Sequence, residues 1–304
     1  MREVLTSARR RLVAFVRAFV RFVKRFEAVI SAFFLRNVTR LAAIITACVL
    51  LFLVGYILVK GVPHLSWDLF AWEYNSVNVS LMPALINTIV MTLLSLLIAV
   101  PLGIFGAIYL VEYTGRGSRF VGLVRITAET LAGIPSIVYG LFGLLFFVTA
   151  LGWGLSLIAG ACTLSIMILP LILRTTEEAL KSVPDAYREG SFGLGAGRLR
   201  TVFRIVLPSA VPGILAGVIL AVGRIVGESA ALIYTAGTVT QAPDSLLDST
   251  RTLAVHMYNI SSEGLHIDKT YATAVVLLAI VVGVNALSSY IARKVTKGNG
   301  NGQD

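Results

Sequence analysis

The sequence predicts an all-α polytopic membrane protein with six transmembrane helices, and three observations lead to this fold class. Of its 304 residues, 57% are hydrophobic and only 14% are charged, whereas soluble domains average about 25% charged residues. The mean hydropathy is +0.85. Six apolar runs are close to or longer than the approximately 20 residues that a helix needs to cross a bilayer. They cover residues 41–59, 84–111, 126–150, 155–173, 208–235 and 271–291.

A basic segment, residues 1–40, precedes the first run and is predicted to form an amphipathic cytoplasmic helix. Phe15, Phe19, Phe22 and Phe26 recur at helical spacing with arginines between them, which is typical of a helix lying in the headgroup region. The pattern fits an interfacial anchor and also a regulatory contact with a cytoplasmic partner. The apolar run that follows begins too late and is too long for a secretory signal, so it is expected to remain as the first span.

The positive charges predict the orientation of the chain in the membrane. Ten lysines and arginines lie in residues 1–40, three in 112–125 and six in 174–204, whereas 61–83 and 151–154 contain none. The positive-inside rule then places both termini in the cytoplasm of a multi-pass protein of the inner, or plasma, membrane. The net charge of +10 is thus expected to face anionic lipid headgroups, and no nucleic acid is expected as a partner.

Two connecting segments complete the predicted topology. The longest outer loop covers about residues 236–270. The chain ends in the Gly- and Asn-rich run GNGNGQD, which predicts a disordered cytoplasmic tail over residues 293–304.

The inside loop 174–208 is predicted to carry a short helix. Ser182 has the position of an N-cap, with Pro184 in the first turn and Asp185 at the reciprocal capping position. Gly195 is expected to end the helix in the left-handed conformation. Arg188 and Glu189 point away from a face that suits insertion into a groove on another protein. That face is formed by Val183, Ala186, Tyr187, Gly190, Ser191 and Leu194.

The spacing in this loop resembles the coupling loop of permease subunits in binding-protein-dependent ABC importers. That motif reads Glu-Ala-Ala, three residues, Gly, nine residues, Ile-x-Leu-Pro, and here Gly190 and Ser191 replace both alanines. Small size is retained, although Gly weakens a helix by about 1 kcal/mol relative to Ala. The resemblance implies a type I ABC importer permease-like fold. It also implies an ATPase-coupling role for Tyr187, Glu189, Gly190, Ser191, Leu194, Gly195, Ile205, Leu207 and Pro208.

A second set of motifs is similar to the permeases of phosphate importers, specifically the PstA-type subunit. The motifs are AGIPSIVYGLFG at 132–143, GRIVGESA at 223–230, and Asn87-Thr88 at the start of the second span. This resemblance covers about residues 80–292, which form the core of a predicted permease domain at 41–292. The N-terminal forty residues have no part in it.

The same motifs supply the candidate residues of a translocation pathway: Arg224, Glu228, Asn87, Pro135 and Ser136. Arg224 and Glu228 are four residues apart on one helical face, and ionisable groups inside a bilayer normally face protein or water. They form either a buried ion pair or a site where Arg224 offers its guanidinium to a tetrahedral oxyanion. Pro135 and Ser136 mark either a packing kink or a hinge that lines the path.

Several chemistries are not expected in this chain. No G-x-x-x-x-G-K-[ST] run is present, so ATP and Mg²⁺ are expected to be used by a partner ATPase, with no cofactor bound here. The chain is therefore predicted to be a transporter subunit and not an enzyme, with no catalytic residues. Its histidines and cysteines lack the spacing of a metal site. They are His64, His256, His266, Cys48 and Cys162.

The resemblance implies that the chain imports inorganic phosphate together with three partners. These are a second, PstC-like permease, a PstB-like ATPase dimer, and a PstS-like extracytoplasmic phosphate-binding protein. Import of another oxyanion, such as molybdate or sulfate, and a role as a membrane sensor or scaffold of phosphate signalling are the alternatives. A passive channel or secondary transporter does not account for the spacing from Glu189 to Pro208.

Overall fold

The computed structural model of the protein describes residues 34–115 and 118–300, and these are helical apart from turns and loops, with no strand among them. The all-α prediction is therefore confirmed. The chain divides into two compact units, Met1–Val59 and Lys60–Asp304. The predicted domain 41–292 thus spans both units, because the first span packs no apolar side chain into a core. The predicted amphipathic helix falls largely on residues 1–33, which lie outside the described residues.

Long apolar helices correspond to the predicted spans. Five described helices are long and apolar enough to cross a membrane, and a bent helix pair raises the number to six when it is counted as one span. The five helices are Phe34–His64, Met82–Tyr113, Leu157–Ser182, Arg198–Val226 and Ile267–Leu287.

Two of the predicted spans are broken in the structure. The run 126–150 is not one helix: α3 (Arg119–Ala132) meets α4 (Ser136–Gly143), which continues as the π-turn η4 (Leu144–Ala150), at a bend of 100°. Pro135 is the residue immediately before α4, because proline lacks an N–H and disfavours helical geometry in the residue before it. The run 208–235 is also two helices, α8 (Leu207–Val226) and α9 (Ala230–Thr235).

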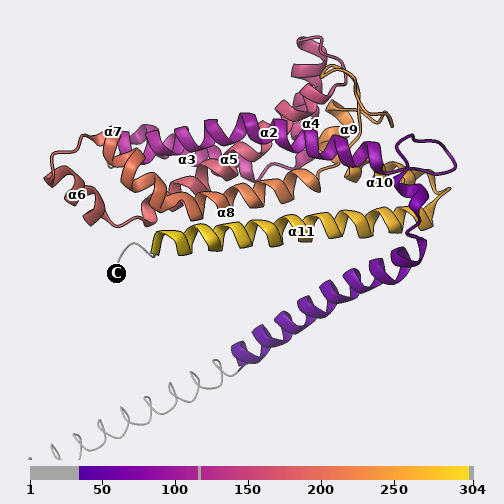
Figure 1. Ribbon diagram of the computed structural model, residues 1–304, viewed down its shortest axis with the longest axis horizontal. Coiled ribbons are helices and arrows are strands. Elements are labelled where there is room, and N and C mark those ends of the chain that lie inside the picture. Colours follow the sequence, from indigo (N-terminus) through magenta and orange to yellow (C-terminus); the bar gives the residue numbers. More distant parts are fainter. Residues whose placement is uncertain (1–33, 116–117, 301–304) are drawn as a thin grey trace, which may run out of the picture. The chain divides into compact units, whose positions relative to one another are not determined.

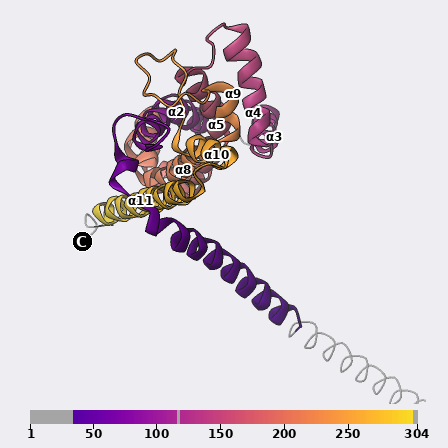
Figure 2. The same cartoon turned by 90° about the vertical axis from the view of Figure 1, so that its right-hand side faces the viewer.

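The second unit is a bundle arranged around one central helix, α5 (Leu157–Ser182). It packs against α2 (Met82–Ile108) and α8, and also against α3 and α4, and Figures 1 and 2 show these helices side by side. Its most apolar stretch is 61% buried, more than that of any other span in the described part of the chain. The core at this junction contains the fully buried side chains Met91, Leu164, Met167, Ile168 and Ile172.

Small residues allow the helices to approach closely. A Cβ on Gly103 of α2 would lie 2.7 Å from the Ile172 side chain of α5, and one on Gly140 of α4 would lie 2.8 Å from the Cα of Ala231 in α9. Such contacts are the usual basis of helix association in membranes, where apolar burial alone supplies little preference. Gly140 and Gly143 of the motif at 132–143 therefore allow close packing between α4 and its neighbours.

The last helix, α11 (Ile267–Gly300), extends into the segment 293–304 for which a disordered tail is predicted. Its backbone is helical through Arg293 and Lys294 to Gly300. Residues 301–304 lie outside the described residues.

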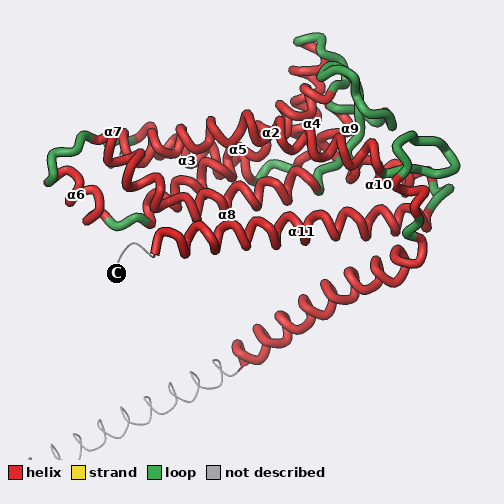
Figure 3. Tube along the Cα trace, in the orientation of Figure 1, coloured by secondary structure: helices red, strands yellow, loops and turns green. Residues whose placement is uncertain are grey.

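Short helices lie at the two ends of this bundle. The first end carries α6 (Asp185–Gly193) and α7 (Arg198–Thr201), and we call it the α6 end. The opposite end carries α10 (Leu253–Glu263), and we call it the α10 end. Figure 3 shows that α6 is flanked by loops on both sides.

Candidate functional site

The loop 174–208 folds as a series of short helices on an apolar base. Its central helix is α6, as predicted, and Gly195 has a φ of +81°, the left-handed conformation expected of it. The capping prediction was wrong. Helix α5 continues nine residues beyond the predicted span, so Ser182 is its last residue and donates its hydroxyl to the Ala179 carbonyl at 2.7 Å. α6 begins after Pro184 with no side-chain cap.

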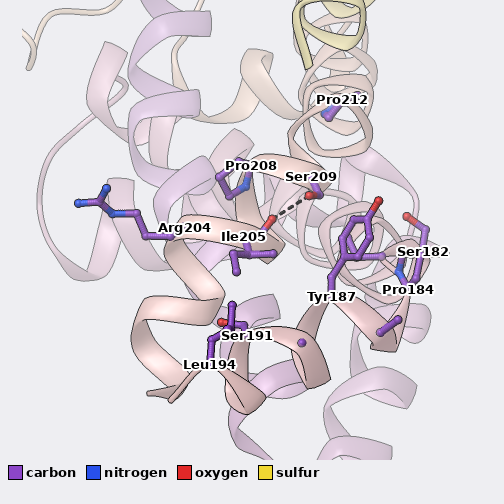
Figure 4. A pocket seen from close by; sticks show the side chains of 13 residues that line it. Ser182, Pro184, Tyr187, Ser191, Leu194, Arg204, Ile205, Pro208, Ser209 and Pro212 are labelled. Atoms are coloured by element: carbon purple, nitrogen blue, oxygen red, sulfur yellow. Dashed lines mark hydrogen bonds between the residues drawn. The ribbon is translucent and has the colours of Figure 1, made fainter. Parts of the chain in front are cut away.

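The predicted face of α6 lines a cavity of about 830 Å³ at the α6 end. Figure 4 shows Tyr187 and Leu194 from α6 gathered around it with Ile205 and Pro208, which lie at the start of the next span. The groove, as we call this cavity, has a volume suited to a sizeable ligand or a protruding segment of a partner. Its lining also includes Ser182, Val183, Pro184, Ala186, Gly190, Ser191, Arg204, Ser209 and Pro212.

The remaining residues predicted to couple to an ATPase have different positions. Glu189 is exposed and Leu207 half-buried, and neither lines the groove. Ser191 is buried, and its hydroxyl is 2.8 Å from that of Thr201 in α7. A Cβ on Gly190 would meet no atom within 4 Å, so the protein's own packing does not require glycine there.

The groove is mechanically continuous with α8. Val183, Val202 and Val206 are buried against Ala179 and Leu180 in one apolar cluster beneath the loop. From there the π-turn η5 (Val202–Val206) runs directly into α8 without an intervening coil. Displacement of α6 and η5 would therefore displace the start of α8.

A second cavity, of about 400 Å³, lies between α3, α5 and α8 and is rich in charge. We call it the charged cavity. Along α5 it extends from Lys181, near the α6 end, to Pro170 in the middle of the helix, a distance of about 16 Å at 1.5 Å per residue. Its ionisable lining residues are Arg125, Glu129, Arg174, Glu177, Glu178, Lys181 and Arg224.

Ion pairs occupy most of these groups. The buried Glu177 accepts from Arg125 Nε at 2.6 Å and from Lys181 at 2.7 Å. Arg174 pairs with Glu178 at 3.0 Å. Among the described residues, by contrast, no carboxylate lies within 4 Å of the Arg224 guanidinium.

The expected contact between Arg224 and Glu228 is therefore not present. Helix α8 ends at Val226, and Gly227 follows it, so the four-residue spacing no longer places both side chains on one helical face. The carboxylate of Glu228 instead accepts from the backbone N–H of Ala231 at 3.1 Å and stabilises the start of α9.

The other pathway candidates lie outside the charged cavity. Pro135 and Ser136 are at the bend between α3 and α4, which Tyr139 braces by donating its hydroxyl to the Leu131 carbonyl at 2.8 Å. Asn87 is buried in α2 and donates to the Arg251 carbonyl at 3.3 Å and the Gln241 carbonyl at 3.5 Å. It thus fastens the segment before α10 to the second span.

The structure also groups ionisable residues that the sequence analysis left apart. At the α6 end Arg188 pairs with Glu112, and at the α10 end His256 is fully buried near Arg251 and Tyr74. Burial, together with the Arg251 charge, lowers the pKa of His256 to about 3. The sequence offered one signal for these groupings. Charged residues next to apolar spans normally have partners, so each of them could have been expected to form an ion pair or a similar contact.

These features define a class of protein, a multi-pass helical membrane transport subunit. More specifically, the chain belongs to the family described as the binding-protein-dependent transport system inner membrane component, which matches residues 99–297. It is a permease subunit of the ABC importer type, a component of a transporter.

Relatives and solved structures agree with this membership. The chain is 34% identical over 278 residues to the probable ABC transporter permease protein YqgI of Bacillus subtilis, covering 84% of this chain and 94% of that one. It is 33% identical over 262 residues to the phosphate transport system permease protein PstA 2 of Mycobacterium bovis, covering 84% and 85%.

Two ABC transporters of known structure share the fold. A bacterial alginate transporter matches with a TM-score of 0.62 at 16% identity, over 86% of this chain and 96% of that one. The methionine transporter MetNI, in an inward-facing conformation, matches with a TM-score of 0.56 at 20% identity, over 80% and 97%. The predicted type I ABC importer permease fold is confirmed.

Proposed function

We propose that this chain is the PstA-type permease subunit of an importer that moves inorganic phosphate into the cytoplasm. One observation carries the proposal: helix α8 begins at the groove with Pro208 and contributes Arg224 to the charged cavity near its other end. A single helix thus connects a surface that could bind an ATPase with a cation suited to an anionic substrate.

The groove supports docking of an ATPase at the α6 end. Tyr187 is 46% exposed and Leu194 is 91% exposed, and large apolar side chains beside a concave surface mark a site of protein interaction. In the proposed assembly a PstB-like ATPase dimer binds there from the cytoplasm and hydrolyses ATP. A PstC-like permease completes the pore, and a PstS-like binding protein delivers phosphate at the α10 end.

The charged cavity supports an anionic substrate. Four of its lining side chains are cationic and three are anionic, which leaves one positive charge in excess. Arg224 can present its planar fork of donors to two oxygens of a tetrahedral anion, because no carboxylate of the described residues competes for it. The modest excess charge favours entry of an anion without trapping it.

The choice of phosphate rests on the relatives. Several of them are named as phosphate transport permeases, with identities up to 43% over 155 residues. Another oxyanion remains the second candidate, because the Arg224 chemistry would also accept sulfate or molybdate.

Transport by a reconstituted complex tests the proposal. Proteoliposomes with both permeases, the ATPase and the binding protein should take up radiolabelled phosphate only with ATP. Arg224→Ala should lower the uptake by about 10- to 100-fold, the value of charge-assisted hydrogen bonds. Leu220→Ala, at an exposed position of the same helix, is the matched control and should transport normally.

Two outcomes would contradict the proposal. Normal phosphate uptake by an assembled Arg224→Ala complex would remove the role of that residue. ATP-driven uptake of sulfate or molybdate, with none of phosphate, would assign the chain to another oxyanion.

A further inference from the structure

An ion pair at the α6 end connects α6 to the end of the second span. Arg188 of α6 lies 2.7 Å from Glu112 through Nη2 and Oε1, and its Nε lies 3.1 and 3.3 Å from the two carboxylate oxygens. The side chains are only 14% and 8% exposed. This is a bidentate, charge-assisted contact, which fixes the relative orientation of the two side chains as well as their distance.

The same guanidinium also holds the end of α5. Arg188 Nη2 donates to the Leu180 carbonyl at 2.9 Å, and Nη1 donates to the Val183 carbonyl at 2.8 Å. Carbonyls at a helix C-terminus have no partner within the helix. One side chain therefore joins three segments: α6, the end of α5, and the π-turn η3 (Tyr109–Tyr113), which continues α2.

Backbone packing does not make this connection. The backbone of α6 packs chiefly against α7 and η5, the segments that lead to α8. Arg188 extends away from them, toward α5 and η3. Helix α6 is thus connected to α8 through its backbone packing, and to α2 through the side chain of Arg188.

The ion pair adjoins open space and further charges. A cavity of about 540 Å³ is lined by Glu112 and Arg188, and also by Arg125 and Lys181. The latter two residues hold Glu177 and line the charged cavity as well. This cavity leaves room for the ion pair to shift. Two of the other charged groups that line it, Arg125 and Lys181, also line the charged cavity.

We propose that Arg188 and Glu112 form the link that carries movement of α6 to the second span during ATP-driven transport. The inference rests on the proposed docking of an ATPase at α6. Arg188 is a positioning residue that acts through Glu112 on the end of the second span. Loss of the ion pair removes the side-chain connection from α6 to α2, so ATP hydrolysis and transport become uncoupled.

Glu112→Gln is the first test, because it keeps the side-chain volume and leaves the bonds from Arg188 to the α5 carbonyls. The four-component complex should assemble and retain basal ATP hydrolysis. Stimulation of hydrolysis by the loaded binding protein, and phosphate uptake per ATP, should fall about tenfold, within the range of coupling between distant sites. Uptake per ATP within twofold of the wild type would overturn the inference.

A covalent replacement distinguishes a link from a merely structural contact. In a background with Cys48→Ser and Cys162→Ser, the pair Arg188→Cys and Glu112→Cys should be uncoupled until a short bis-methanethiosulfonate reagent joins the thiols. Joining them should restore uptake per ATP. If uptake per ATP does not recover after cross-linking, the inference is overturned. This outcome decides the question even if the Glu112→Gln complex fails to assemble.

The control and the readout separate this inference from the proposed function. Gly193→Cys with Glu112→Cys places a thiol at an exposed position of α6 outside the predicted coupling residues, and cross-linking this pair should restore nothing. Restoration by this pair to the same extent would show that any tether suffices and would overturn the specific role of Arg188. Binding-protein stimulation of ATP hydrolysis reports on the link even if the transported anion is not phosphate.

Discussion

Buried ionisable side chains mark both ends of the bundle. At the α6 end, Arg188 and Glu177 have full sets of partners. At the α10 end, Arg251 is 4% exposed and stacks over the Tyr74 ring at 4.9 Å, and His256 is fully buried. The paired residues at the α6 end are suited to transmitting movement between helices. The buried His256 makes the stability of the α10 end sensitive to low pH.

The low pKa of His256 predicts a loss of stability on acidification. His256 is neutral when folded at any pH above about 3, whereas an unfolded histidine takes up a proton near pH 6.5. The unfolded state therefore binds more protons between these values, and stability is lost as the pH falls below 6.5. From pH 7 to pH 5 this residue lowers the free energy of unfolding by about 2 kcal/mol.

Thermal unfolding of the detergent-solubilised protein at both pH values measures the effect. His256→Gln should reduce the difference between pH 7 and pH 5. Ser261→Gln, at an exposed neutral position of the same helix, should leave that difference unchanged. An equal pH dependence in wild type and His256→Gln would refute the assignment.

At the scale of the element, the sequence of α6 gives the helix little stability of its own. Gly190 weakens it, its N-terminus has no side-chain cap, and Ser191 spends its hydroxyl on Thr201. The contacts that hold the helix include the ion pair of Arg188 with Glu112 and the bond between Ser191 and Thr201. We therefore expect a bound partner to be able to adjust the conformation of α6.

Substitutions at Gly190 separate helix stability from docking. Because a Cβ there meets no atom of the chain, Gly190→Ala should stabilise α6 by roughly 0.5–1 kcal/mol and leave transport intact. Gly190→Arg places a bulky charge at the groove and should uncouple ATP hydrolysis from uptake. Gly193→Arg, on the same helix, outside the groove lining and equally unobstructed, is the control. Normal transport by Gly190→Arg would show that the groove is not the docking surface.

The bend between α3 and α4 is the second feature at this scale. Pro135 and the neighbouring glycines predicted an interruption, and the angle of 100° is far larger than a kink. The size of the bend is set by α4 packing on α9, where Gly140 lies against Ala231. Local sequence could indicate the break but not the direction of the second helix.

At the scale of the whole molecule, the charge distribution predicts which end faces the cytoplasm. In a background with Cys48→Ser and Cys162→Ser, Leu194→Cys at the α6 end and Leu247→Cys at the α10 end supply exposed thiols. The positive-inside rule predicts that a membrane-impermeant maleimide applied to intact cells labels residue 247 and not residue 194. Permeabilised cells should be labelled at both positions, and labelling of residue 194 in intact cells would invert the topology.

Much of the fold was predictable from the sequence because it depends on short-range patterns. Apolar length specified the spans, and glycine at 195 specified a left-handed residue, which has a φ of +81°. The face of α6 also followed from helical spacing, and six of its residues line the groove. The motif from Glu189 to Pro208 predicted the loop that carries α6, and its coupling role stays a prediction.

The sequence by itself therefore determined the membrane fold class, the helix-bearing loop and the family. Tertiary structure alone decided which charges are paired: Arg188 meets Glu112 across 76 residues and Arg125 meets Glu177 across 52. Arg224 and Glu228, four residues apart, do not meet, because α8 ends between them. Helical periodicity acts over a few residues, whereas the partner of a buried charge is chosen by helices that are distant in the chain and adjacent in the bundle.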